Sequence, residues 1–448
     1  LLRPWQELDR STWPCGFEAG RIARNLLAGE GYGSPFAVRP GEGFRVGPGG
    51  PGARPDPAPS TGPIPATAWI TPPNVYMWVL VFRLFGVYSP VSWAAYLGLQ
   101  VALMAWALFL LWRALSLAAG RRAAAAGLLL LLAYPLTWSM PLSDTHSSTL
   151  FVFLLAASLY ALARWLGGGR WPWLGLHALA AAAAVLSEGS ALLFLAAFEG
   201  WLAVRGVRGG RPAGGNAPGW APVPPAPRRL SRPATVLLTA GLACLLTWGP
   251  WLVRNWRVLG APVLLKSNLR VERWLGNNPD ALVGILHSQD EHGVYSNESE
   301  RRLLLQMGEP AYARLCGRRF VDFVSDRPAD FLLLTARRVL HFWTMLPGKP
   351  NPARPLLTAL FLAVLALFAG LRFREWRRAR RGADRPDRPW LETAAVCFLL
   401  WYPPAYYVTH FFMYRYRFPL EMMLLVAVAC ALARALPPRP EMRAAGAD

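Results

Sequence analysis

Nine apolar stretches, each close to the length of a membrane-crossing helix, constrain the fold of this chain more than any other feature. A helix needs about 20 apolar residues to cross the hydrocarbon core of a bilayer. The chain is 54% hydrophobic over 448 residues and its mean hydropathy is +0.26, which is high for a water-soluble protein. We therefore expect an all-α polytopic membrane protein. The predicted spans are residues 89–112, 123–141, 146–165, 172–187, 190–205, 234–253, 353–371, 390–409 and 416–436.

The connections between these spans alternate in their content of arginine, which predicts a topology. Short loops rich in Lys and Arg remain in the cytoplasm, whereas long segments cross the membrane regardless of charge. The Arg-rich loops are 113–122, 164–170, 205–233 and 372–388. We therefore expect the other connections to face outward, namely residues 1–88, 142–145, 188–189, 254–352 and 410–415.

This topology divides the chain into seven parts, and two of its segments are rich in Pro, Gly and Arg. Such segments bury too little apolar surface to fold alone, so we expect a disordered insert at 39–66 and a cytoplasmic linker at 206–233. An outward N-terminus without an export signal predicts that one N-terminal span is missing from the sequence. The parts are an outer loop at 1–88, a transmembrane bundle at 89–205, the linker, a span at 234–253, an extracytoplasmic segment at 254–352, C-terminal spans at 353–436 and a cytoplasmic tail at 437–448.

The formal net charge of +21 would point to nucleic acid if the protein were soluble. Here the charge lies mostly in loops at the predicted cytoplasmic surface. Anionic lipid headgroups of the bilayer are therefore the expected partner of these loops, and no nucleic-acid partner is expected.

Two short helices are predicted in the first outer loop. The spacing over 17–27 is helical and places Glu18, Arg21 and Asn25 beside one another. A second, apolar helix should begin at Pro72 and end at Phe85. Both are too short to cross a bilayer and should lie along its interface.

Several runs in this order resemble the GT-C superfamily of polytopic membrane glycosyltransferases, most closely the protein mannosyltransferase-like members of family 39 and the related RgtA-type bacterial enzymes. The runs are FEAGRIARNLLAGEGYGSPF, TAWITPPNVYMWVLVFRLFGVYS, PLSDTHSSTLFVFLL, WGPWLVRNWRVLGAPVLLKSNLRVERWLGNNPDA, GEPAYARLCGRRFVDFVSDRPADFLLLTARRVLHFW and YYVTHFFMYRYRFPLE. The resemblance covers most of the chain outside the two Pro-rich segments. It implies a GT-C-type helical bundle with interfacial helices in the first outer loop and a small extracytoplasmic helical segment.

The resemblance also implies an activity in the bacterial inner membrane. Such enzymes transfer a sugar from a polyprenyl-phosphate donor to a lipid, glycan or protein acceptor on the extracytoplasmic face, inverting the anomeric carbon with one carboxylate base. Glu18 matches that base, and its alternative role is an ion pair with Arg21. Asp144 is the second candidate carboxylate, although an Asp before an apolar run also caps a helix. His146 lies beside it as a candidate substrate ligand.

The leaving phosphate of such a donor needs cations. Arg254, Arg415 and Arg417 lie near the predicted outer boundary of the membrane and are the candidates, together with His410. Their alternative role is to extend to the interface beside Tyr and Trp. No cofactor is required by the sequence, and a divalent metal has no support because the spacing of His287, Asp290 and His292 fits no zinc pattern.

Two other functions remain open at this point. A transporter or flippase of lipid-linked substrates should carry ionisable residues near the middle of its spans, whereas the charges of this sequence lie mainly at the ends of the spans. A membrane scaffold without catalytic activity would not depend on Glu18.

Overall fold

The computed structural model describes residues 17–37, 63–143, 145–168, 170–205, 233–344, 353–381, 389–409 and 414–435. Over these residues the protein is helical and holds no β-strand, only an isolated bridge between Gly33 and Ala66. Five helices are long and apolar enough to cross a membrane, which makes the chain an integral membrane protein. The all-α polytopic class predicted from the sequence is confirmed, while most of the 39–66 insert, the linker, Asp144 and His410 lie outside the described residues.

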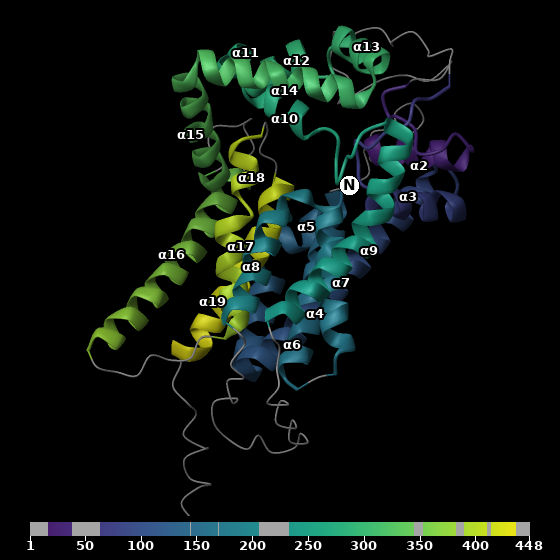
Figure 1. Cartoon of the computed structure of the whole chain (residues 1–448). Coiled ribbons are helices and arrows are strands. Elements are labelled where there is room, and N and C mark those ends of the chain that lie inside the picture. The colour runs from purple at the N-terminus through teal and green to yellow at the C-terminus, as the bar shows by residue number, and fades with distance from the viewer. Residues whose placement is uncertain are drawn as a thin grey trace, which may run out of the picture.

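The apolar helices form one bundle with a layer of short helices at one end (Figure 1). Helix α19 lies in its core, and 78% of its apolar window is buried, against 17% in α9 and in α16. The latter two helices therefore present most of their apolar side chains to the lipid. The bundle consists of α4 (Pro90–Ala133), α5 (Pro135–Ser143), α6 (Ser148–Leu166), α7 (Pro172–Ser187), η1 (Gly189–Ala191), α8 (Leu192–Arg205), α9 (Pro233–Leu259), α16 (Ala353–Arg380), α17 (Trp390–Trp401), α18 (Pro404–Tyr407) and α19 (Tyr414–Ala435).

The predicted loop at 113–122 is wrong, because α4 continues through it as a helix as far as Gly120. Gly120 has φ +87, a left-handed conformation that glycine adopts without strain, and there the helix reverses. The two halves of α4 then pack side by side, since Leu115 lies directly against Gly127. Reversal by a single glycine leaves little room for a loop.

Proline divides two other predicted spans. The predicted span at 123–141 is interrupted at Tyr134, after which α5 begins with Pro135. The span at 390–409 becomes α17 and the short α18, which follows Pro403. Proline has no backbone N–H to donate to the preceding turn of a helix, and its ring clashes with that turn. The helix before each of these prolines therefore ends ahead of it.

A methyl group at Gly127 should destabilise the bundle. It would lie 2.4 Å from Leu115 Cδ1 and 3.3 Å from Ala429 Cβ. We expect Gly127→Ala to reduce the free energy of unfolding by about 1–3 kcal/mol, as overpacking of a core does. Gly98→Ala in the same helix is the control, because no atom lies within 4 Å of the added methyl. Thermal unfolding in detergent measures both, and equal melting temperatures would contradict the packing described here.

The two short helices of the first loop are confirmed as α2 (Phe17–Leu27) and α3 (Pro72–Phe85). Ala19, Ile22 and Ala23 of α2 are buried in the core that also holds the buried residues of α3. This packing leaves the first turn of α2 beside the layer of short helices.

The layer of short helices is called the helical cap below. It holds α10 (Leu269–Gly276), α11 (Pro279–Val283), α12 (Ile285–His292), α13 (Glu298–Met307), α14 (Glu309–Asp326) and α15 (Pro328–Thr344). Helices α13 and α14 are separated by Gly308 alone, which has φ +77 and so breaks the helical path.

The cap is joined to the first loop by a shared core and by Glu309. Phe36 and Trp69 of the loop pack in the same apolar cluster as the cap residues Tyr312 and Phe323. The buried Glu309 carboxylate accepts hydrogen bonds from the Ala68 amide at 2.9 Å, from the Ser267 hydroxyl at 2.7 Å and from the Thr67 hydroxyl. Burial raises the pKa of Glu309 above its ordinary value, while these donors lower it.

Candidate functional site

Glu18 stands in the first turn of α2, and its carboxylate faces the junction between the first loop and the cap. Its Oε1 accepts hydrogen bonds from Trp69 Nε1 at 2.9 Å and from the Tyr295 hydroxyl. Trp69 Nε1 also lies 2.8 Å from the Tyr295 oxygen. Two donors from different parts of the chain therefore hold this carboxylate in one orientation, which a base needs in order to meet its substrate.

Tyr295 remains a donor at physiological pH. Burial raises the pKa of its hydroxyl well above the ordinary value, and the neighbouring negative charges of Glu18 and Glu272 raise it further. The hydroxyl is therefore protonated and directs its hydrogen toward Glu18.

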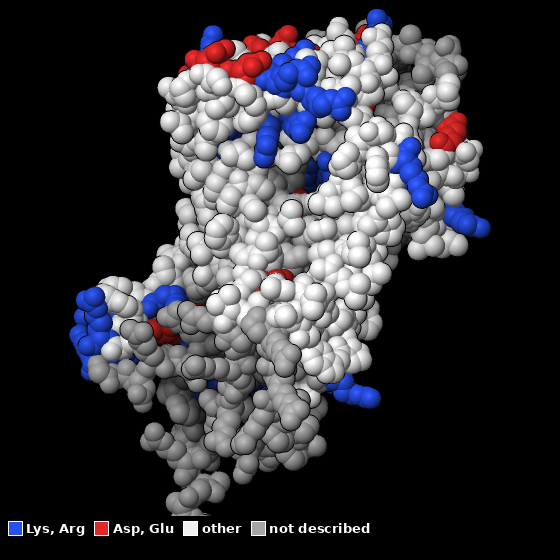
Figure 2. Space-filling model, in the orientation of Figure 1, with Lys and Arg blue, Asp and Glu red and all other residues white. Residues whose placement is uncertain are grey.

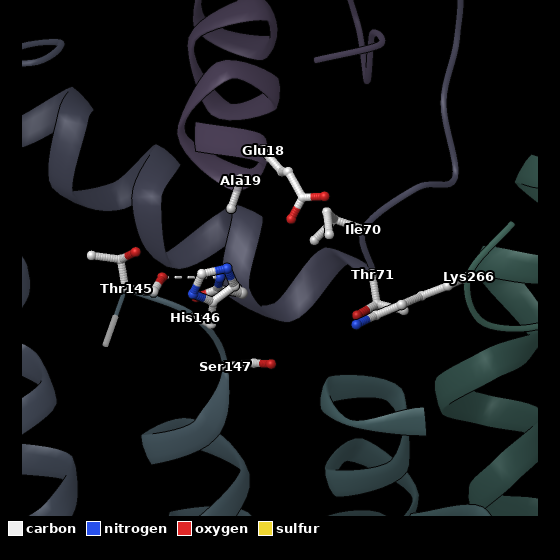
Figure 3. A pocket seen from close by; sticks show the side chains of 9 residues that line it. Glu18, Ala19, Ile70, Thr71, Thr145, His146, Ser147 and Lys266 are labelled. Atoms are coloured by element: carbon white, nitrogen blue, oxygen red, sulfur yellow. Dashed lines mark hydrogen bonds between the residues drawn. The ribbon is translucent and has the colours of Figure 1, made fainter. Parts of the chain in front are cut away.

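A small pocket adjoins the Glu18 side chain (Figure 3). Its volume is about 30 Å³, enough for water but far too small for a sugar. A sugar substrate would therefore have to widen it. The pocket is lined by Glu18, Ala19, Ile70, Thr71, Asn74, Thr145, His146, Ser147 and Lys266.

His146 lines this pocket, as its role as a candidate ligand requires. The neighbouring Thr145 is fixed through its carbonyl oxygen, which accepts from the Tyr96 hydroxyl at 3.1 Å and from Asn74 Nδ2 at 3.4 Å. The segment before α6 is thus held against α3 and α4. The predicted cap or site role of Asp144 lies outside the described residues.

Lys266 is the cation of the pocket, and sequence reasoning missed it. It comes from the segment that joins α9 to the cap. It is one of only two lysines in the chain, against 45 arginines. The use of a compact ammonium where the chain otherwise uses guanidinium is the signal that could have identified it.

Arg254 has a structural role, and its predicted contact with a phosphate stays a prediction. Its guanidinium donates to the carbonyl oxygens of Thr67 at 2.5 Å and Tyr32 at 3.0 Å. It also lies 5.1 Å from the ring centroids of both Tyr32 and Trp251. These hydrogen bonds go to the main chain of the first loop, so the guanidinium connects that loop to α9.

Arg417 does not lie at the membrane boundary that the sequence predicted for it. It is fully buried and forms an ion pair with Glu421, one helical turn further along α19. Its Nη1 lies 3.3 Å from the Phe342 carbonyl oxygen, and its guanidinium lies over the ring of Phe361. A lipid phosphate at the membrane interface cannot reach it.

Arg415 is partly exposed and is the candidate cation that the structure leaves accessible in this region. It donates to the Tyr416 hydroxyl at 3.0 Å, and Tyr416 stacks on Tyr406 with ring centroids 4.7 Å apart. The Tyr406 hydroxyl in turn lies 3.3 Å from Glu188 Oε1. Arg415 is therefore connected through tyrosines to a second carboxylate.

Glu188 lies directly between α7 and η1, so the connection predicted at 188–189 is a tight turn. Its carboxylate accepts from the Ser190 hydroxyl at 3.0 Å. Ser190 is also hydrogen-bonded to Tyr406 at 2.7 Å. The turn and the polar cluster occur together, in a partly exposed position.

No group of three or more His, Cys, Asp or Glu suited to a metal ion occurs within the described residues. His287 and His292 each approach Asp280 instead, at 3.4 and 2.8 Å. Comparison of the chain with protein-family models, with curated proteins and with solved structures found no match. The site itself therefore carries any assignment of function.

Proposed function

We propose that this protein is an inverting membrane glycosyltransferase that transfers a sugar from a polyprenyl-phosphate donor to an acceptor on the extracytoplasmic face. One observation carries the proposal. The carboxylate of Glu18, oriented by two donors, lines the same pocket as Lys266, a cation that has no ion pair with any residue the structure describes. A one-step displacement at an anomeric carbon needs this pair of groups, a base for the acceptor and a positive charge for the leaving phosphate.

In the proposed step the acceptor hydroxyl gives its proton to the Glu18 carboxylate as its oxygen bonds to the anomeric carbon. The bond from that carbon to the phosphate oxygen breaks at the same time, and the lipid phosphate leaves with its electron pair. Lys266 stabilises the charge that develops on that phosphate. Attack from the side opposite the leaving group inverts the anomeric carbon.

The distribution of charge supports an extracytoplasmic site. The basic end of α16, which holds Arg374, Arg377 and Arg378, lies at the end of the bundle away from the cap (Figure 1). Basic segments next to spans favour the cytoplasm. The cap and Glu18 then belong to the opposite side.

The transporter or flippase remains the second candidate because of one observation. Although the charges were expected mainly at the ends of the spans, one ionisable pair occurs inside them: His177 of α7 lies 2.9 Å from Glu199 of α8. Residues of this kind within a membrane often mark substrate or ion pathways.

A transfer assay separates the two functions. Purified protein in liposomes is given radiolabelled polyprenyl-phosphate sugars and an extract containing candidate acceptors. A glycosyltransferase moves label from the carrier lipid to a new product, whereas a flippase changes only the leaflet in which the labelled lipid is found. Mass spectrometry of the carrier lipid that accumulates in a deletion strain identifies the sugar. Movement between leaflets without any transfer would overturn the proposal.

Removal of the Tyr295 hydroxyl should slow transfer. Tyr295→Phe takes away one of the two donors that orient the Glu18 carboxylate, and a base that is held less firmly meets its substrate less often in the reactive geometry. We therefore expect the rate of transfer to fall about tenfold to hundredfold. Tyr312→Phe is the control, because Tyr312 donates to Glu300 within the cap. An unchanged rate in Tyr295→Phe would contradict this role.

A further inference from the structure

The basic residues between 254 and 344 divide into two groups. Seven of the thirteen have a partner within the protein, either a carboxylate, a carbonyl oxygen or another contact. The other six form no ion pair and no side-chain hydrogen bond with any residue that the structure describes. Arg257 is one of these and lies near the end of α9. The remaining five are Lys266, Arg270, Arg273, Arg314 and Arg318, and we call them the basic track.

The basic track extends from the Glu18 pocket onto the cap. Lys266 lines the pocket and belongs to the segment that leads into α10, where Arg270 and Arg273 lie three residues apart on one face of the helix. Helix α10 packs against α14. Figure 2 shows Lys and Arg side chains gathered over α10 and α14, above a hollow in the surface.

Gly317 of α14 brings the two helices close enough for their arginines to adjoin. A Cβ atom at Gly317 would lie 3.1 Å from Arg270 Cδ, so the Arg270 side chain lies across this glycine. Arg314 and Arg318 flank it on the same helix. From the rise per helical residue and the usual distance between packed helices, the track is roughly 20 Å long.

Five like charges that have no carboxylate partner among the described residues repel one another and do not stabilise the cap. One of them, Arg273, has a buried Nε without a hydrogen-bond partner among the described atoms. A guanidinium binds phosphate and carboxylate oxygens with two parallel hydrogen bonds. The arrangement is suited to an extended anion that supplies the missing acceptors.

We propose that the basic track binds an anionic glycan, a sugar chain with phosphate or carboxylate groups, and that this glycan is the acceptor whose end enters the Glu18 pocket. A chain fits better than a lipid surface because the track leads from the pocket onto the cap, away from the apolar bundle (Figures 1 and 2). The identity of the glycan as acceptor rests on the proposed function, while its binding does not.

Binding of two defined oligosaccharides tests this proposal. The probes are an oligogalacturonate of about ten sugars, which has one carboxylate per sugar, and a neutral dextran oligomer of equal length. The protein is held in nanodiscs of phosphatidylcholine, and the dissociation constant is measured at several salt concentrations. We expect the anionic probe to bind, with an affinity that falls as salt rises, and the neutral probe not to bind.

Two triple variants with the same change of charge locate the binding. Arg270→Gln/Arg314→Gln/Arg318→Gln should weaken binding of the oligogalacturonate about tenfold to hundredfold and reduce its dependence on salt. Arg374→Gln/Arg377→Gln/Arg378→Gln, on the exposed basic end of α16, should leave both within about twofold. Equal losses in the two variants, or equal binding of the neutral probe, would overturn the proposal.

Two further measurements separate glycan binding from docking on lipid and from the proposed catalysis. If the track docks on lipid, the wild type will bind vesicles of phosphatidylglycerol in a manner that the cap variant loses, without binding the oligogalacturonate, and the proposal fails. Glu18→Gln should bind the oligogalacturonate as the wild type does. If it binds normally and also transfers sugar normally, Glu18 is not the base, while the glycan surface stands.

Discussion

Glu18→Gln is expected to abolish sugar transfer in a protein that is still folded and inserted in the membrane. Gln retains the size of Glu and one oxygen that can accept from Trp69 and Tyr295. It cannot accept the proton of the acceptor hydroxyl. Loss of a general base lowers a rate by about a hundredfold to ten-thousandfold.

The assay measures transfer from a polyprenyl-phosphate donor by purified protein in liposomes, with thermal unfolding as the test of folding. Glu30→Gln is the matched control, because Glu30 lies in the same loop with its side chain exposed. Activity close to wild type in Glu18→Gln would move the base elsewhere, with Asp144 the next candidate. Activity in both single variants and in the double variant would rule out the mechanism proposed here.

The second large effect is expected inside the bundle, where three helices share one polar cluster. His177 Nε2 lies 2.9 Å from Glu199 Oε1, and its Nδ1 lies 2.8 Å from the Ser158 hydroxyl. All three residues are buried. His177→Leu leaves the Glu199 carboxylate without this partner in an apolar setting, which should reduce the free energy of unfolding by about 3–5 kcal/mol.

The double variant His177→Leu/Glu199→Leu distinguishes the effect of removing one partner from the effect of removing both. Replacing both partners by apolar residues of similar size is often neutral or stabilising, so the double variant should melt at a higher temperature than His177→Leu alone. Thermal unfolding in nanodiscs compares the two proteins. A double variant that is less stable than either single one would show that the pair itself stabilises the bundle.

The helices of the first loop could be predicted because their signals are local. Helical spacing gave the bounds of α2, and Pro72 and Gly86 gave those of α3. A reversal between the first two spans was predicted at 113–122, but its restriction to Gly120 could not be, because the arginines around this glycine suit a loop as well as the end of a helix. The packing of Leu115 on Gly127 shows that the two helices extend up to the turn.

The partners of the site could not be predicted, for a different reason. Glu18 was selected by a resemblance, yet the residues that orient it lie 51 and 277 positions away in the sequence. Periodicity carries no information on contacts at such distances. Arg417 was misjudged because a sequence shows a charge near the end of a span but not the carboxylate or the main-chain oxygen that its donors face.

Trp69 belongs at once to the apolar core of the cap and to the hydrogen bonds of Glu18. Tyr295, from the cap, holds the same carboxylate. The orientation of the base therefore depends on the packing that joins the cap to the first loop. A change that loosens this packing should cost the site its geometry as well as the protein its stability, even where it alters no residue of the pocket.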